Sequence, residues 1–437
     1  MRHASARLLF TGLLLLALPE GRAAAQDVGP DVTVFTLQAT NNYGSIDGIR
    51  GYSVATTACN AGTEPLAWCT TPSSFGCNGG VLTGRDHPVI AQNMYRLKNG
   101  RFEQLGASWL KHGFQSLNTG SNTCGPTGTC TQPPLGDRQL GVGCIDAYTA
   151  NENGHRPAGR KSEVDPATGA FPYPSAGGGS VAAMWNQRLA VAEADLEASL
   201  NPGAAYYLEG HYVTADDAMA GNGLNNASYR QVTIQPGTYD IVLAFQPVRQ
   251  KAAIKAWAAA DPEVEMLDLD LPTAPVERFH VARKVTDLGN GRWHYEYAIH
   301  NMNSKRAADG LRIDFGEPVF LSNAGFHDVD SHSGEPYDVT DWEISTPFRS
   351  VRWAAPFFTP PENANALRWG TLYSFWFDAS RPPTAIESHT LSLFEAGMPA
   401  EMVFLETPQV PETTLFADGF ESGGTAAWSS ATPGSGP

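Results

Sequence analysis

Two histidines at the ends of a predicted β-hairpin are the residues of this chain best placed for metal chemistry. Strand-forming runs over 89–97 and 101–110 flank Asn99-Gly100, a dipeptide that favours a type I′ turn between antiparallel strands. With this turn, His87 falls directly opposite His112. Directly opposed Cβ atoms lie about 4.5–5.5 Å apart. We therefore expect the two imidazoles to come close enough to share a copper or zinc ion.

The other side chains that this register pairs are chemically matched. The predicted pairs are Arg96 with Glu103, Leu97 with Phe102, Met94 with Leu105, Ile90 with Trp109, and Val89 with Leu110. Each such pair stabilises a hairpin by about 0.2–1 kcal/mol. A bulge along the strands would change the register, so that His87 and His112 would no longer lie opposite each other. The alternative interpretation is a polar hairpin end in which both rings are solvated.

A metal site needs ligands beyond this pair. Glu209 and His211 lie two apart in the predicted strand AAYYLEGHYVT, so their side chains project from one face of it. We expect His211 as the third ligand, with Glu209 or Asp146 as a nearby carboxylate.

Acidic residues between 328 and 341 suggest a second type of site. Asp328 and Asp330, with neighbouring Asp and Glu residues, could supply the oxygen ligands that calcium prefers. The spacing is not that of an EF-hand loop, and such clusters are ordinary turn material. An ordinary turn is therefore the main alternative to calcium binding.

Other chemical motifs are weaker. His280, His294 and His300 lie in a second predicted hairpin among aromatic residues, where packing within the strands is the expected role. The sequence contains no Gly-x-Ser-x-Gly elbow, His-Glu-x-x-His helix or Walker-type loop.

The first residues predict export. Arg2, His3 and Arg7 precede an apolar run over 8–18, and Ala23-Ala24-Ala25 precedes Gln26. A basic start, a short apolar run and small residues form a signal peptide. We expect 1–25 to be cleaved between Ala25 and Gln26, which makes the mature protein secreted, periplasmic or bound to the cell surface.

All six cysteines lie between Cys59 and Cys144. In an oxidising compartment such a set predicts disulfides rather than zinc ligands. Cys69/Cys77 and Cys124/Cys130 each close a small loop, so we expect these two bridges and a third between Cys59 and Cys144.

The remaining sequence predicts a mainly β protein. Residues 26–270 form a loop-rich, disulfide-stapled N-terminal β domain, with short helices capped by Thr214 and over 250–260. Residues 271–408 form an antiparallel β-sandwich of the immunoglobulin or fibronectin type, beginning with a hairpin around Asn290-Gly291. Residues 409–437 form a flexible tail.

The charge and hydropathy of the chain argue against nucleic acid as a partner and against a membrane span. The formal net charge is −16 at pH 7, which would repel nucleic acid. No segment after the leader has the roughly 20 apolar residues of a membrane span. An extracellular polymer or a surface ligand is the expected partner.

Two segments resemble known exported proteins. The stretch 42–164, including HPVIAQNMYRLKNGRFEQLGASWLKHGF, is similar to a group of exported bacterial proteins with no assigned activity. LFADGFESGG, which begins at Leu415, resembles a C-terminal tail shared by many exported bacterial proteins. This resemblance implies a Gram-negative envelope or extracellular location and no particular activity.

Two functions follow from these observations. The preferred hypothesis is an exported structural or ligand-binding β protein without a catalytic site. The alternative is a copper- or zinc-dependent extracellular oxidoreductase or hydrolase that uses His87, His112 and His211.

Overall fold

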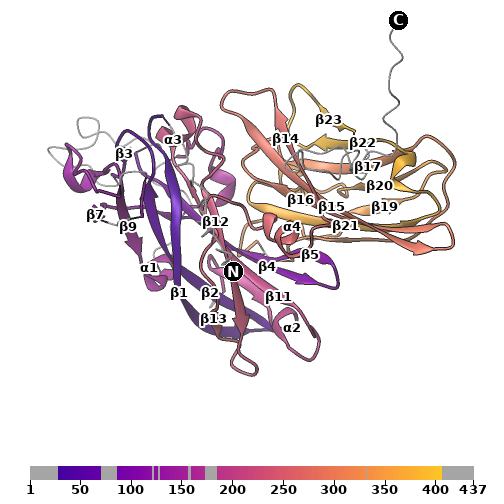
Figure 1. Ribbon diagram of the computed structural model, residues 1–437, viewed down its shortest axis with the longest axis horizontal. Helices are drawn as coiled ribbons and strands as arrows, with labels where there is room; N and C mark the ends of the chain where they lie inside the picture. Colours follow the sequence, from indigo (N-terminus) through magenta and orange to yellow (C-terminus); the bar gives the residue numbers. More distant parts are fainter. Residues whose placement is uncertain are drawn as a thin grey trace, which may run out of the picture.

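The computed structural model describes residues 28–69, 86–120, 123–125, 128–155, 159–172, 185–330 and 332–405. It confirms a mainly β protein made of antiparallel sheets, which form two bodies side by side (Figure 1). The predicted signal peptide, its cleavage site and the C-terminal tail lie outside the described residues. Within those residues, no helix is long and apolar enough to cross a membrane.

The N-terminal body consists of two facing sheets and a two-stranded sheet. The first sheet has the order β1-β2-β9-β7, with β10 also paired to β2. Its strands are β1 (Val32–Ile46), β2 (Ile49–Asn60), β9 (Cys144–Tyr148), β7 (Thr119–Gly120) and β10 (Leu189–Ala192). The second sheet has the order β13-β12-β11-β4-β5, with β6 also paired to β4. Its strands are β13 (Ile241–Leu243), β12 (Ala227–Ile234), β11 (Ala205–Val213), β4 (Val89–Lys98), β5 (Arg101–Ala107) and β6 (Lys111–His112). The small sheet pairs β3 (Leu66–Ala67) with β8 (Gln139–Leu140).

Apolar side chains from both large sheets fill the space between them. Val34 and Val54 of the first sheet and Leu208 and Val232 of the second belong to one buried cluster. The alternation of apolar and polar residues in the strands therefore places one face of each sheet in a common core.

The C-terminal body also has two facing five-stranded sheets. One has the order β14-β15-β16-β21-β18, and the other β19-β20-β17-β22-β23. The strands of the first are β14 (Glu265–Leu271), β15 (Glu277–Gly289), β16 (Arg292–Asn301), β21 (Thr371–Ala379) and β18 (Leu321–His327). The strands of the second are β19 (Glu343–Ser345), β20 (Ser350–Ala354), β17 (Ala308–Phe315), β22 (Ile386–Leu393) and β23 (Glu401–Phe404). Tyr295 and Phe377 of the first sheet and Phe315 and Trp353 of the second share one core. The immunoglobulin or fibronectin type of this body stays a prediction.

Helices are short. The α-helices are α1 (Ala150–His155), α2 (Glu193–Leu196), α3 (Ala215–Ala220) and α4 (Lys255–Ala260). The 3-10 helices are η2 (Gly136–Arg138), η3 (Lys161–Glu163), η4 (Pro361–Asn363) and η5 (Pro383–Ala385). Thr214 caps α3 as predicted, accepting a hydrogen bond from the Asp217 amide. The helix expected over 250–260 is shorter, because only its second half is α-helical, and it ends before Asp261.

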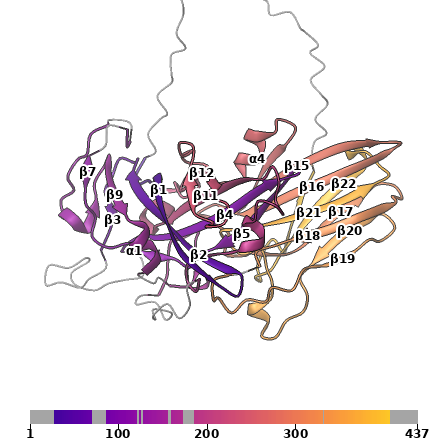
Figure 2. The same ribbon diagram turned by 90° about the horizontal axis from the view of Figure 1, so that it is seen from below.

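The two bodies meet along β5 and α4, as Figures 1 and 2 show. The Ser374 hydroxyl on β21 donates to the Phe102 carbonyl oxygen at 2.7 Å, and the Leu372 amide donates to Oε1 of Gln104 at 2.6 Å. An ion pair between Arg101 and Glu296 spans the same boundary at 2.6 Å. β14, which lies at the end of the predicted N-terminal domain, pairs with β15 and so belongs to the C-terminal sheets.

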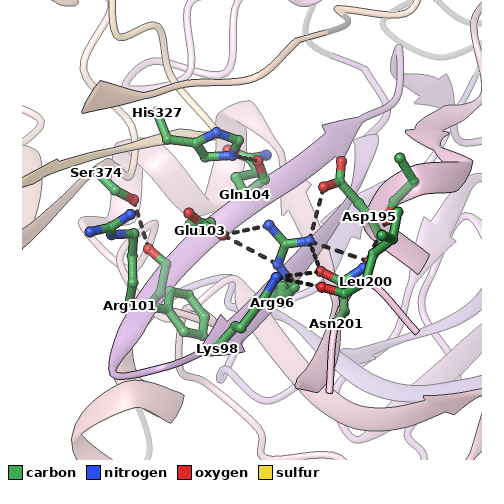
Figure 3. Close-up of polar contacts among 12 residues, drawn as sticks. Arg96, Lys98, Arg101, Glu103, Gln104, Asp195, Leu200, Asn201, His327 and Ser374 are labelled. Atoms are coloured by element: carbon green, nitrogen blue, oxygen red, sulfur yellow. Dashed lines mark hydrogen bonds and ion pairs between the residues drawn. The ribbon is translucent and has the colours of Figure 1, made fainter. Parts of the chain in front are cut away.

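A polar network fixes the β4–β5 hairpin to α2 (Figure 3). The Arg96 guanidinium contacts Glu103 at 2.7 Å, Asp195 at 2.9 Å and Asn201 Oδ1 at 2.7 Å. On the opposite side of the hairpin, Ser374 contacts β5 from the C-terminal body. The hairpin is thus held from both bodies.

The observed disulfides differ from two of the predicted bridges. Cys59 bonds to Cys124, and Cys130 bonds to Cys144, so the predicted pairs Cys59–Cys144 and Cys124–Cys130 are wrong. Cys59 lies opposite Ile145 in the β2–β9 pairing. The next residue back, Cys144, therefore projects from the other face of the sheet and cannot meet Cys59.

The third predicted bridge is described only in part. Cys69 is disulfide-bonded, while its predicted partner, Cys77, lies outside the described residues.

Candidate functional site

His87 and His112 lie together, although the predicted register between them is wrong. Nε2 of His87 and Nδ1 of His112 are 2.7 Å apart, and the ring centroids are separated by 5.0 Å. Val89, rather than His87, lies opposite His112. The rings still meet because a shift of two residues keeps both side chains on the same face of the sheet.

Two one-residue changes in register add up to this shift: a bulge between Met94 and Tyr95, and a second change between Asn93, which pairs with Ala107, and Ile90, which pairs with Lys111. The pairs Arg96/Glu103 and Leu97/Phe102 are confirmed near the turn, and the register then changes between Met94 and Tyr95. Met94 pairs with Gly106, Ile90 with Lys111 and Val89 with His112. Three predicted pairs are therefore wrong: Met94 with Leu105, Ile90 with Trp109, and Val89 with Leu110.

The histidine pair is neutral and hydrogen-bonded. Burial lowers the pKa of His87 to about 3 and that of His112 to about 4. Two nitrogens bound to one tetrahedral zinc ion at about 2.0–2.1 Å would lie about 3.3 Å apart. The observed 2.7 Å fits a hydrogen bond between the two rings. A shared ion would have to displace that hydrogen bond.

His211 and Glu209 do not lie beside His87 and His112, where they could act as further metal ligands. His211 lies opposite Ala91 on β4, four residues and roughly 13 Å along the strand from His87. Its ring packs edge-on against Trp369, with centroids 5.9 Å apart. Over the part of the chain that the structure describes, no group of three or more His, Cys, Asp or Glu side chains could hold a metal ion.

The Glu209 carboxylate has a structural environment of its own. It is fully buried and accepts hydrogen bonds from Asn93 Nδ2 at 2.8 Å, the Tyr95 hydroxyl at 3.0 Å and the Ala253 amide at 2.6 Å. Burial raises the pKa of Glu209. The Asp146 carboxylate is similarly occupied, because it accepts from the Trp68 indole at 2.9 Å and the Leu117 amide at 2.7 Å.

Asp328 and Asp330 lie between β18 and the next strand. Asp328 is 2% exposed and accepts a hydrogen bond from Asn365 Nδ2. Burial raises its pKa to about 6, whereas Asp330 is exposed. Burial therefore makes ionisation of Asp328, which a calcium ligand needs, less favourable than usual. Calcium binding at this position stays a prediction.

The histidines of the second hairpin differ from one another. His294 lies between Asp378 and Glu296, at 2.6 and 2.9 Å, and these carboxylates raise its pKa. His280 stacks on His300 with centroids 5.9 Å apart. Both ring nitrogens of His300 are buried and have no hydrogen-bond partner among the described residues.

A pocket of about 350 Å³ lies where the two bodies meet. Ala107 and Ser108, at the end of β5, form part of its wall, together with the segment that contains η3. The opposite wall comes from the C-terminal body, from 332–337 and from 362–371. This volume falls within the range of small-molecule sites, about 300–1,000 Å³.

Lys161 is the most unusual residue of the pocket. Its side chain is 8% exposed, and its ammonium contacts only neutral acceptors, Asn93 Oδ1 at 3.2 Å and the Gly370 carbonyl oxygen at 3.5 Å. No ion pair of Lys161 occurs within the described ranges. Burial lowers the pKa of Lys161 to about 8. The Trp369 indole donates to the Lys161 carbonyl oxygen at 3.0 Å, which fixes this wall of the pocket.

Two arginines line the same pocket. The Arg368 guanidinium lies 3.9 Å from the centroid of the Tyr337 ring, and that of Arg160 lies 5.5 Å from the centroid of Trp109. Both are cation–π contacts, which hold the guanidinium groups without neutralising them.

No motif in the sequence indicates this pocket. Lys161 lies in a short polar stretch that matches no motif, and Arg368 and Trp369 lie more than 200 residues further along the chain. Only the packing of the two bodies brings these residues together.

Comparisons with known proteins assign no family. No protein-family model matches the sequence, and no curated protein matches it. One matching structure is the exo-chitosanase CsxA of Amycolatopsis orientalis in complex with PNP-beta-D-glucosamine, which is 7% identical, with a TM-score of 0.16 over 84% of this chain and 26% of that chain. Another structure of this enzyme, on its inhibition by a glucosamine-configured castanospermine, is 8% identical, with the same TM-score and coverage. This chain thus spans about a quarter of the length of the enzyme, and likenesses this weak carry no argument about function.

Proposed function

We propose that this chain is an exported β protein that binds a small polar molecule in the pocket between its two bodies. The observation that carries this proposal is the pocket itself, which combines a volume of about 350 Å³ with the buried Lys161 and the aromatic wall of Trp369 and Tyr337. Small-molecule sites typically occur at domain boundaries and combine apolar walls with a few convergent polar groups. The disulfides at Cys59 and Cys130 agree with an oxidising compartment.

A thermal-shift screen tests this proposal. The mature protein is melted with a panel of monosaccharides, small organic acids and amino acids, because a ligand that binds only the folded state raises Tm. Asn363→Trp places a bulky ring in the pocket wall, and Thr233→Trp places the same ring at an exposed position on β12 as a control. We expect at least one compound to stabilise the wild type and Thr233→Trp but not Asn363→Trp. A panel with no such compound would contradict the proposal.

The second candidate function is a copper- or zinc-dependent enzyme, and the contact between His87 and His112 favours it. Elemental analysis of the purified protein tests this candidate, with the His87→Ala/His112→Ala double variant as the comparison. Near-stoichiometric copper or zinc that disappears in a folded double variant would support it. A wild type that binds neither metal after incubation with copper and zinc salts would remove it.

A further inference from the structure

The cationic groups of the pocket have unused hydrogen-bonding capacity. Nε of Arg160 and Nε of Arg368 are buried and have no acceptor among the residues that the structure describes. The Lys161 ammonium, also buried, has only the two neutral acceptors described above. Buried donors are normally satisfied, so the two unpaired Nε groups, together with an ammonium held only by neutral acceptors, favour a ligand that brings acceptors.

The charges of these groups act on the same space. After burial, the charges of Lys161 and Arg368 are the causes that lower the pKa of His332, which lines the pocket. The Arg368 guanidinium lies over the ring of Tyr337, on the same wall, and the charge of Arg160 acts to lower the pKa of this tyrosine. The three cations are therefore neighbours across the pocket.

The carboxylates near the pocket form no ion pair with Lys161 among the described residues, and the charges of Glu209 and Glu335 offset only part of the effect of burial on its pKa. Glu335 accepts from the Ser162 hydroxyl at 2.8 Å and the Ser162 amide at 3.3 Å. Glu209 lies beyond Asn93, whose amide bridges the two charges. Glu362 and Glu395 are exposed, where water screens their charge.

We propose that the pocket recognises a small carboxylate of about monosaccharide size, with Lys161 as its counter-charge and Arg160 and Arg368 as flanking donors. This inference rests on the proposed function and names its ligand class. A carboxylate suits the site because ammonium and guanidinium groups form charge-assisted hydrogen bonds with it. A single negative charge is preferred to a doubly charged anion, because Glu335 lines the same pocket.

Calorimetric titration tests this inference with matched pairs of sugars. The probes are D-glucuronate and D-galacturonate, with D-glucose and D-galactose as their neutral counterparts, and inorganic phosphate as a non-organic anion. We expect the wild type to bind at least one sugar acid about tenfold or more tightly than its neutral counterpart, as one charge-assisted hydrogen bond implies. Lys161→Met should abolish this preference and leave the affinity for the neutral sugar unchanged.

Lys305→Met is the matched control. Lys305 lines the same pocket but is exposed, so its removal should change the affinity for the sugar acid by about twofold or less. The melting curve and near-ultraviolet circular dichroism of Lys161→Met establish that this variant is folded before titration.

The remaining outcomes separate the two proposals. If the acid and neutral sugars bind equally, or if neither acid binds, the carboxylate inference is wrong. The pocket function still stands in that case if a screened ligand is lost in Asn363→Trp. Phosphate that binds more tightly than both acids and is lost in Lys161→Met would show a site for inorganic anions and overturn the inference.

Discussion

Replacing Lys161 with methionine should stabilise the protein at neutral pH, because it removes a charge whose cost of burial exceeds the attraction of Glu209 and Glu335. Burial lowers the pKa of Lys161 from its ordinary value of 10.5 to about 8, and this difference corresponds to about 3 kcal/mol of lost stability when the amine is charged. The variant also loses the hydrogen bonds to Asn93 and Gly370, which offsets about 1–2 kcal/mol. We expect a net gain in the free energy of unfolding of about 1–2 kcal/mol at pH 7.

The pH dependence of this gain is a sharper test. The unfolded chain keeps the Lys161 proton up to about pH 10.5, whereas the folded protein releases it near pH 8. Wild-type stability therefore rises with pH through this window, and that of Lys161→Met lacks this contribution. The advantage of the variant should shrink by about 2–3 kcal/mol between about pH 7 and about pH 10.

Guanidinium unfolding followed by tryptophan fluorescence measures both quantities, with Lys305→Met as the control that shows neither effect. If Lys161→Met is less stable than the wild type by about 2 kcal/mol or more at pH 7, and this difference does not change with pH, then the buried ammonium does not destabilise the fold.

Three further predictions concern the fold. The Cys130→Ser/Cys144→Ser variant should lose about 3 kcal/mol, because this bridge closes a loop with a sequence separation of 14; an unchanged Tm under oxidising conditions would contradict this. His300→Leu should raise the free energy of unfolding and make it fall less steeply as the pH is lowered. Burial holds the pKa of His300 well below 6.5, so the unfolded chain takes up this proton before the folded protein does. A variant whose stability depends on pH as the wild type's does would speak against this. Ser374→Ala should destabilise the protein by about 1 kcal/mol, because it leaves the Phe102 carbonyl oxygen without this donor. Chemical unfolding measures the loss, with Ser345→Ala at an exposed position on β19 as the control.

Local sequence signals predicted the hairpin turns correctly. Asn99 and Gly100, and likewise Asn290 and Gly291, have the positive φ angles that a type I′ turn needs. The pairing near the first turn is also as predicted, at Arg96 with Glu103. These features depend on neighbouring residues, whose preferences can be inferred from the chain itself.

Features that depend on distant contacts could not be predicted. The bulge at Met94/Tyr95 occurs where Gly106 packs against β10: a Cβ on Gly106 would lie 1.9 Å from the Ala190 carbonyl oxygen. The cysteine pairing depends on which face of β9 carries Cys144. The pocket depends on the contact between the two bodies, which places Trp369 beside Lys161.

The carboxylate site is best examined in a crystal structure of the protein soaked with D-glucuronate and, separately, with D-galacturonate. We expect a sugar acid in the pocket between the bodies, with a carboxylate oxygen within hydrogen-bond distance of Lys161 Nζ. A sugar acid bound only outside this pocket, or an occupied pocket in which the carboxylate points away from Lys161, would contradict this expectation.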